Sequence, residues 1–211
     1  MFVVFEGIDG SGTSTQLPIL TKHIKELSKY HDVLETHEPW KSDEIKRRLR
    51  EDRDAYSGAN EMAALYVDDR RSHSENLINP NLEQGVFVLS DRYTLSTFAY
   101  QMTQGVSQAK LLKLHKDKRL IAPDITFYVR VSPETAIERI ESRGDEKEKF
   151  EQEEFLRTLV NSYDYWVNQG ETNPDILLGN LRVIDGERSI EDVAVAVRRE
   201  FNEFFTYRRN L

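Results

Sequence analysis

Short apolar runs recur along the 211-residue chain and alternate with segments of helical spacing. β-branched and aromatic residues fill the runs, which predict strands at Phe2–Phe5, Asp32–Thr36, Val86–Leu89, Ile125–Val131 and Leu181–Ile184. Helical spacing marks Gln16–Tyr30, Asp43–Glu51, Glu61–Ile78, Ser96–Met102, Gln108–Leu120, Phe150–Trp166 and Ile190–Phe205, and a further helix begins after Ser132. This alternation predicts an α/β fold of three layers, in which a five-stranded parallel sheet is flanked by helices, as one domain over 1–211.

The first predicted strand leads into a glycine-rich stretch, Gly7 to Gly12, and then into a helix. Glycines let a backbone turn tightly and approach a polyphosphate, while the helix N-terminus offers N–H groups to the anion. The spacing matches the Walker A pattern GxxxxGK[ST], except that Thr13 replaces the lysine. Ser14 keeps the hydroxyl that ligates Mg²⁺ in that pattern. The alternative interpretation is a Gly/Ser-rich turn without a ligand.

Asp91 and Arg92 directly follow the predicted strand Val86–Leu89. Ligands of open parallel sheets bind outside the carboxyl ends of the strands. We therefore expect Arg92 at the same edge of the sheet as the Gly7–Gly12 loop, where a guanidinium can bind a phosphate.

The composition restricts the function classes. The net charge of −8 argues against a general nucleic-acid binder, so an anionic substrate must meet locally placed arginines. No apolar run approaches the ~18 residues of a membrane span. The chain has no cysteine, which excludes thiolate metal sites and fits a cytoplasmic protein.

Six motifs in a fixed order resemble the thymidylate kinase family, within the P-loop nucleoside monophosphate kinases. They are FEGIDGSG with STQ at Phe5–Gln16, HEP at His37–Pro39, LYVDDR at Leu65–Arg70, LSDRY with STFAYQ at Leu89–Gln101, PETAIERI with SRG through Val131–Gly144, and VIDGERSIEDV at Val183–Val193. The resemblance covers nearly the whole chain. It implies phosphoryl transfer from ATP to dTMP, with Mg²⁺, giving dTDP, and a homodimer with a small mobile lid over about 139–152.

The resemblance also implies site residues. The catalytic ones are Asp9, Arg92 and Arg143. The ATP-binding ones are Gly7, Ile8, Asp9, Gly10, Ser11, Gly12, Thr13, Ser14, Thr15, Arg139, Arg143, Asp185 and Arg188. The dTMP-binding ones are Asp9, Glu38, Lys41, Tyr66, Arg70, Arg92, Ser96, Thr97, Tyr100 and Gln101, with Arg70 and Arg92 on the phosphate and Tyr66 stacked on thymine. Ser14 and Asp91 are the predicted metal ligands.

Each of these residues also has a structural interpretation. Tyr66 and Tyr100 suit a core, Arg70 and the pair Arg139 and Arg143 suit a solvated helix face, and Asp185 begins a turn signal.

Thr13 is the main departure from the family. We expect another cation to supply the missing charge, with Arg143, Lys147 and Lys149 as candidates. Two other functions stay open: a nucleotide-binding paralogue with impaired catalysis, and a kinase of another deoxynucleotide or of a deoxynucleoside. Glu38 is the carboxylate that a deoxynucleoside kinase would use as a base.

Overall fold

A parallel sheet lies at the centre of the structure, a computed structural model that describes residues 1–116, 120–144, 149–170 and 172–209. Five strands pair in the order β2-β3-β1-β4-β5, all parallel. They are β1 (Phe2–Glu6), β2 (Val33–His37), β3 (Phe87–Asp91), β4 (Ile125–Arg130) and β5 (Asn180–Asp185). The chain passes from β3 on one side of β1 to β4 on the other, and ligands bind at such a switch point.

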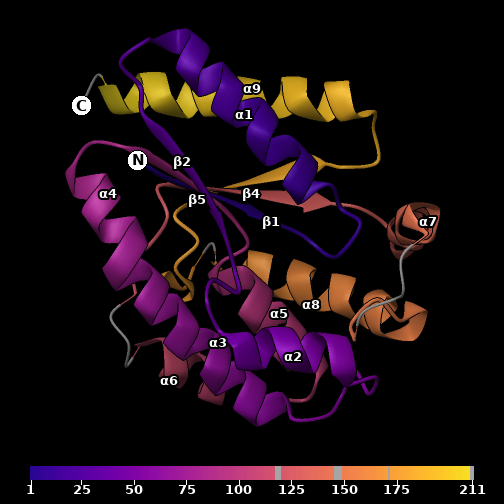
Figure 1. The fold of residues 1–211 in the computed structure, drawn as a ribbon. Coiled ribbons are helices and arrows are strands. Elements are labelled where there is room, and N and C mark those ends of the chain that lie inside the picture. The colour runs from indigo at the N-terminus through magenta and orange to yellow at the C-terminus, as the bar shows by residue number, and fades with distance from the viewer. Residues whose placement is uncertain (117–119, 145–148, 171, 210–211) are drawn as a thin grey trace.

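The strands are apolar on both faces because helices cover both. Along β1, Val3 and Phe5 pack against α1 (Thr13–Leu27) and α9 (Ile190–Arg209), whereas Phe2 and Val4 pack on the opposite side. This alternation follows from the two-residue period of a strand. Figure 1 shows α1 and α9 together above the sheet and the other large helices below it.

The helices of the second face carry one wall of the site. They are α2 (Asp43–Glu51), α3 (Ala59–His73), α4 (Asn79–Glu83), α5 (Thr94–Thr103), α6 (Gln108–Lys116) and α8 (Glu153–Gly170) (Figure 1). Helix α5 is the innermost of them, with Thr94 through Gln101 buried against α8 and α3. A burial of this extent leaves α5 no free face for a subunit contact. Helix α7 (Pro133–Arg143) follows β4 and lies at the edge of the sheet.

The structure confirms the predicted fold class and most element positions. Ser42 and Ser132 cap α2 and α7, accepting hydrogen bonds from Ile45 N and Thr135 N. The prediction that Asn79-Pro80 ends the third helix is wrong. A π-helical turn at Ser74–Ile78 leads instead into α4. Pro80 stands in the first turn of α4, where the N–H group that proline lacks would have no intrahelical partner.

The predicted lid spans 139–152, of which 145–148 lie outside the described residues, Lys147 among them. Its described flanks are the end of α7 and the stretch before α8, which begins at Glu153 rather than at the predicted Phe150. Single-domain organisation with a lid therefore stays a prediction. In the described part of the chain, no helix has both the length and the apolar character needed to cross a membrane.

Candidate active site

The loop between β1 and α1 forms one wall of a polar cavity. Gly10 and Gly12 have φ angles of +81° and +97°, a conformation that side chains disfavour. The first turn of α1, Thr13 to Thr15, lines the cavity, and the N-terminus of a helix attracts an anion. Because the resemblance assigns ATP to most of the residues around it, we call this the donor cavity. It is lined by Ile8, Asp9, Gly10, Gly12, Thr13, Ser14, Thr15, Arg92, Arg139 and Arg143.

The remaining predicted ATP residues lie outside that lining. The Gly7 carbonyl accepts hydrogen bonds from Arg92 Nη1 at 2.8 Å and from Tyr163 at 3.0 Å, and Ser11 is buried behind the loop. Asp185 and Arg188 form an exposed ion pair of 2.9 Å with each other. The structure therefore brings nine of the predicted ATP residues together around one cavity and leaves Gly7, Ser11, Asp185 and Arg188 outside its lining.

Arg139 fastens α7 to the loop. Its Nη2 donates to Gly186 O at 2.9 Å and its Nη1 to Gly10 O at 3.3 Å. A guanidinium that binds these carbonyls holds the loop and the β5–α9 turn in a fixed relation to α7. Arg139 thus both lines the donor cavity and holds the elements around it in place.

The predicted metal ligands Ser14 and Asp91 are in direct contact. The Ser14 hydroxyl donates to Asp91 Oδ2, while Asp91 Oδ1 is buried with no hydrogen-bond partner within the described residues. A carboxylate oxygen buried without a partner is costly, and a cation removes the cost. Hydroxyl and carboxylate oxygens are ligands that suit Mg²⁺.

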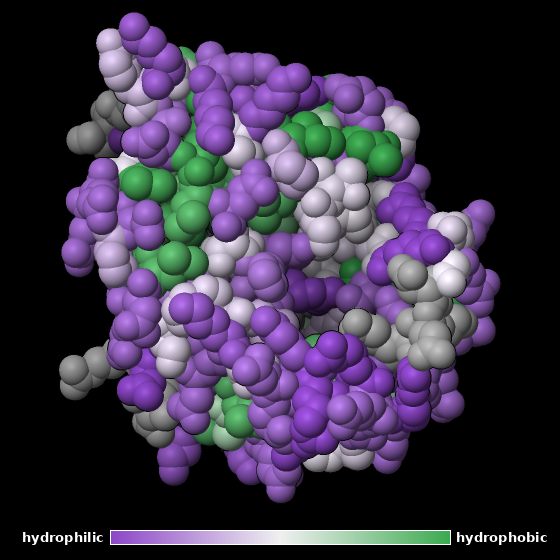
Figure 2. Space-filling model, in the orientation of Figure 1, coloured by the Kyte–Doolittle hydropathy of each residue, from purple (hydrophilic) through white to green (hydrophobic). Residues whose placement is uncertain are grey.

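A second cavity opens beside the first, between the sheet edge and α2, α3 and α5. Figure 2 shows a hollow near the centre of this face, with hydrophilic residues around it. This acceptor cavity is lined by Asp9, Glu38, Pro39, Leu49, Tyr66, Arg70, Arg92, Tyr93, Ser96, Thr97, Tyr100, Gln101 and Phe150. Asp9 and Arg92 line both cavities, so the two cavities meet at this pair.

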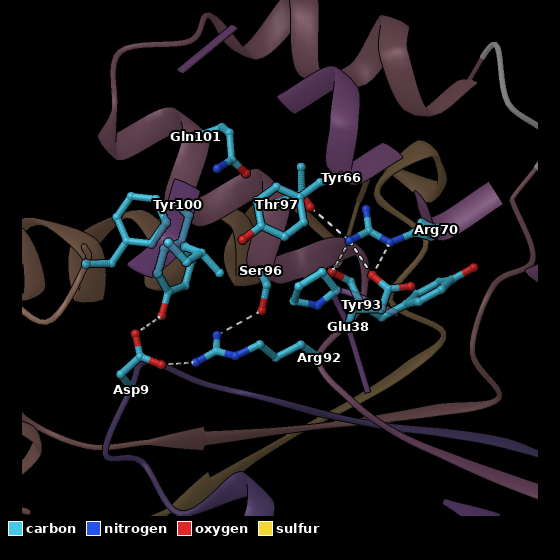
Figure 3. Close-up of a pocket in the computed structure, with 13 residues that line it drawn as sticks. Asp9, Glu38, Tyr66, Arg70, Arg92, Tyr93, Ser96, Thr97, Tyr100 and Gln101 are labelled. Atoms are coloured by element: carbon cyan, nitrogen blue, oxygen red, sulfur yellow. Dashed lines mark hydrogen bonds and ion pairs between the residues drawn. The ribbon is translucent and has the colours of Figure 1, made fainter. Parts of the chain in front are cut away.

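Arg92 is held at the boundary by a network of short hydrogen bonds (Figure 3). Its Nη2 binds Asp9 Oδ1 at 2.6 Å, and its Nη1 donates to Ser96 Oγ at 3.1 Å. Tyr100 donates to the other Asp9 oxygen at 2.9 Å, and burial raises the pKa of Tyr100 well above its ordinary value, so it stays a donor. Arg92 itself has a φ of +70°, a strained conformation of the kind that clusters at functional sites.

Arg70 occupies a different environment from Arg92. Its side chain is 1% exposed and forms a 2.6 Å ion pair with Glu38. Its other N–H groups donate to Tyr93 O, Thr97 Oγ1 and His115 Nε2 at 2.8, 2.8 and 3.1 Å. Burial and the nearby Arg70 charge lower the pKa of His115 to about 3, so this imidazole is a neutral acceptor.

This pairing bears on the predicted roles of both residues. Both arginines pair with a carboxylate at 2.6 Å, but the Arg70 side chain is 1% exposed whereas that of Arg92 is 19% exposed. Because the donors of Arg70 are also bonded inside the protein, Arg70 suits a neutral oxygen on a ligand better than a phosphate dianion. Glu38 Oε1 lies 3.2 Å from His73 Nδ1 and Oε2 binds Arg70, so neither oxygen is free to act as the base of a deoxynucleoside kinase.

Lys41 and Lys149 line neither cavity. Lys41 is exposed, with its ammonium 4.2 Å from the centroid of the Trp40 ring. Lys149 is fully buried and bonded to Asp52 and to Ser57 Oγ, the latter at 2.6 Å. Of the three candidates for the missing charge, the structure places Arg143 in the donor cavity, whereas Lys149 is committed elsewhere and Lys147 is among the residues not described.

Sequence reasoning missed Glu6, which ends β1. Its carboxylate accepts from Tyr93 N at 2.8 Å and from Ser96 Oγ at 2.5 Å, and burial raises the pKa of Glu6 to about 7. An acidic residue at the end of an otherwise apolar strand was the available signal. Leu49 and Phe150 were also missed, because apolar residues outside the motifs carry no local mark of a site.

Comparison with known proteins identifies the family. The family model described as thymidylate kinase matches residues 5–196. The chain belongs to the thymidylate kinase family. Similar proteins include the thymidylate kinases of Mycoplasmopsis pulmonis, 32% identical over 98% of this chain and 90% of the relative, and of Dinoroseobacter shibae, 36% identical over 92% and 93%. That of Thermosipho africanus is 32% identical over 94% of this chain and 96% of its own.

The match confirms the predicted enzyme class. A thymidylate kinase phosphorylates dTMP with ATP, so the two adjoining cavities have two expected occupants, and the resemblance carried by the six motifs holds over nearly the whole chain.

Proposed function

We propose that this thymidylate kinase transfers the γ-phosphoryl group of ATP, bound in the donor cavity, to the phosphate of dTMP, bound in the acceptor cavity. The observation that carries the proposal is that Asp9 and Arg92 line both cavities and bind each other at 2.6 Å. Phosphoryl transfer needs in-line alignment and positive charge around the transferring group rather than covalent participation by the protein.

Arg92 binds the acceptor phosphate at the boundary, where its guanidinium stays partly accessible, with 19% of the side chain exposed. Asp9 and Ser96 hold the guanidinium plane, so little rotamer freedom is lost when the phosphate arrives. Ser14 and Asp91 would hold Mg²⁺, which neutralises charge on the β- and γ-phosphates when bound. The unpartnered Asp91 Oδ1 supports this assignment.

The far end of the acceptor cavity binds the base. Tyr66 offers an aromatic face, and stacking on a pyrimidine contributes ~1–3 kcal/mol. Gln101 is fully buried and its Oε1 has no hydrogen-bond partner among the described residues, so it can accept the N3 hydrogen of thymine. Arg70, already neutralised by Glu38, is suited to a base carbonyl. Thr97 and Tyr100 complete the wall between base and phosphate.

The test is an ADP-release assay with Mg-ATP and dTMP, dUMP, dCMP, AMP or thymidine as acceptor. Turnover with dTMP well above the others is expected. The variant Arg92→Met should lower kcat/KM for dTMP by at least ~10²-fold, since a charge-assisted contact to phosphate is lost. The matched control is Arg130→Met, because Arg130 ends β4 and pairs with Asp164 at 2.8 Å but lines neither cavity.

Three results would overturn the proposal. An equal loss of kcat/KM in both arginine variants would show that Arg92 does not bind the substrate. Turnover of thymidine in place of dTMP would indicate a nucleoside acceptor. Binding of ATP and dTMP by calorimetry without ADP release would indicate a nucleotide-binding paralogue that has lost catalysis.

The homodimer and the cytoplasmic location expected from the resemblance stay predictions. Sedimentation velocity on the purified protein measures the first. Because α5 is buried in its own chain, a dimer would form through other surfaces, such as the outer face of α3.

A further inference from the structure

Gln104 follows α5 and is 8% exposed, one helical turn beyond Gln101. Its Nε2 donates to two backbone carbonyls of the 52–58 loop, Ala55 O at 2.6 Å and Ser57 O at 3.3 Å. Its Oε1 accepts from Gln101 Nε2 at 3.2 Å. None of these three hydrogen bonds, all between described residues, involves a charged side chain. Gln104 does not line the acceptor cavity.

The two amide orientations follow from this chain of bonds. A carbonyl oxygen is only an acceptor, so the Gln104 atom that faces Ala55 O and Ser57 O must be the nitrogen. The other Gln104 atom is then the oxygen, and the Gln101 atom that faces it must in turn be a nitrogen. Gln101 therefore presents its oxygen to the acceptor cavity, where that oxygen is buried and has no hydrogen-bond partner in the described part of the chain.

The loop that starts this relay is itself anchored. Lys149 donates to Ser57 O at 3.2 Å and to Ser57 Oγ at 2.6 Å, and its buried ammonium forms an ion pair with the half-buried Asp52. Ala55 is 1% exposed within the apolar core. The two carbonyls are thus fixed in place, and a rotation of the Gln104 amide would face oxygen against oxygen.

We propose that Gln104 determines base specificity: it locks the Gln101 amide so that the acceptor cavity takes a base with a hydrogen on N3, thymine or uracil, and rejects cytosine. The inference rests on the proposed function, because it assigns the base to the Gln101 end of the cavity. Cytosine carries a hydrogen-bond acceptor at N3. A lone pair on N3 would therefore face a lone pair on Gln101 Oε1, with no hydrogen between them. A site built to receive a donor discriminates strongly against a base that lacks it.

The lock matters because a free glutamine would not discriminate. An unrestrained amide can rotate by 180° and offer Nε2 to cytosine as readily as Oε1 to thymine. Gln104 acts through Gln101 and touches no substrate, so it is a positioning residue.

Two variants at the same position test the proposal by the ratio of kcat/KM for dTMP to kcat/KM for dCMP. Gln104→Met keeps the length and volume of the side chain but removes its three hydrogen bonds, and the ratio should fall by ~10-fold. Gln104→Glu still accepts from Gln101 Nε2 but no longer donates to the loop carbonyls. We expect it to be less stable than the wild type while it retains the ratio within about twofold.

Thr103→Val is the matched control. Thr103 is the neighbouring residue, its Oγ1 donates to Ser162 Oγ at 2.8 Å, and it lines neither cavity. The control should lose stability with an unchanged ratio. If Gln104→Met leaves the ratio unchanged, or if Gln104→Glu lowers it as much as Gln104→Met does, Gln104 supports the fold only and the inference is wrong.

Failure of the proposed function is a separate outcome. If the wild-type protein turns over no acceptor, calorimetric binding of dTMP and dCMP to the same three variants replaces kcat/KM as the readout. If Gln104 orients the Gln101 amide, the ratio of the binding constants for dTMP and dCMP should change in the variants as the ratio of kcat/KM does. N3-methyl-dTMP, which has no hydrogen on N3, should bind the wild-type protein no better than dCMP does.

Discussion

Because Thr13 replaces the Walker A lysine, another residue must supply the positive charge next to the phosphates. It lines the donor cavity at the Walker A lysine position, and its hydroxyl carries no charge. Three described cations line the same cavity. Arg92 is held by Asp9 at 2.6 Å and Arg139 by backbone carbonyls. Among the described residues, Arg143 has only a 3.5 Å ion pair with Glu151, so of the three it is the least restrained and the best placed to move to the transferring phosphoryl group.

A rescue experiment tests this substitution of charge. Arg143→Gln should lower kcat by at least ~10²-fold, because a cation next to the transferring group contributes several kcal/mol to transition-state stabilisation. Adding Thr13→Lys to the Arg143→Gln variant should raise its kcat at least tenfold, since the motif accommodates a lysine at this position. Steady-state kinetics of both single variants and the double variant measure the coupling.

Arg157→Gln is the control for that series. Arg157 has the same exposed fraction as Arg143, 48%, and pairs with glutamates, but it lies on α8 outside both cavities. Its kcat should stay within twofold of the wild type. A Thr13→Lys change that leaves the Arg143→Gln defect untouched would show that Arg143 does not replace the lysine.

The elements around the donor cavity depend on a close approach between the loop and α7. A Cβ at Gly10 would lie 2.6 Å from the Ala136 carbonyl of α7, and its φ is +81°. A β-carbon at that distance from backbone forces the two elements apart. Because Arg139 and Arg143 project from α7, their placement over the loop depends on this contact.

Gly10→Ala should therefore lower both stability and ATP affinity. Gly85 is the matched control, with a φ of +80° and no atom within 4 Å of a Cβ built there. Gly85→Ala should cost ~1–2 kcal/mol of unfolding free energy from the left-handed conformation alone. Gly10→Ala should cost ~1–3 kcal/mol more, from overpacking. Urea unfolding and calorimetric ATP titration measure the two effects, and equal losses in the two variants would refute the contact argument.

At the scale of the whole molecule, the two faces of the sheet contribute different parts of the site. Helix α1 supplies the donor cavity from one face, and α3 and α5 supply the acceptor cavity from the other (Figure 1). Glu6 ends the central strand β1 between them and ties it to α5 through Tyr93 N and Ser96 Oγ. Its carboxylate is 1% exposed, which makes it costly to ionise.

The pH dependence of stability follows from that burial. Burial raises the pKa of Glu6 from 4.5 to about 7 in the folded protein. Between these values the folded state binds more protons than the unfolded state, so the free energy of unfolding falls as pH rises from about 4.5 to about 7. Glu6 contributes at most about 3 kcal/mol to this fall.

The isosteric variant Glu6→Gln removes the ionisation. Urea unfolding at intervals from pH 4.5 to pH 8 should show the wild type losing stability relative to the variant as pH rises towards 7, with a constant difference above it. Other titrating groups cancel in this comparison because both proteins carry them. Parallel curves over the whole range would mean that Glu6 titrates at its ordinary pKa.

The sequence by itself determined the fold class and the position of the donor cavity. Apolar strands, the Gly7–Gly12 loop and the capping serines are local patterns, and local patterns fix backbone conformation through sterics and nearby hydrogen bonds. It also located most residues that line the acceptor cavity, through the six motifs.

Only the tertiary structure decided which polar groups pair. Asp9 with Arg92, Glu38 with Arg70 and Lys149 with Asp52 are separated by 83, 32 and 97 residues. No local pattern states which partner will neutralise an arginine, because pairing depends on which elements the fold brings together. For the same reason the sequence could not separate Arg70 from Arg92, or reveal that Gln104 sets the direction of the Gln101 amide.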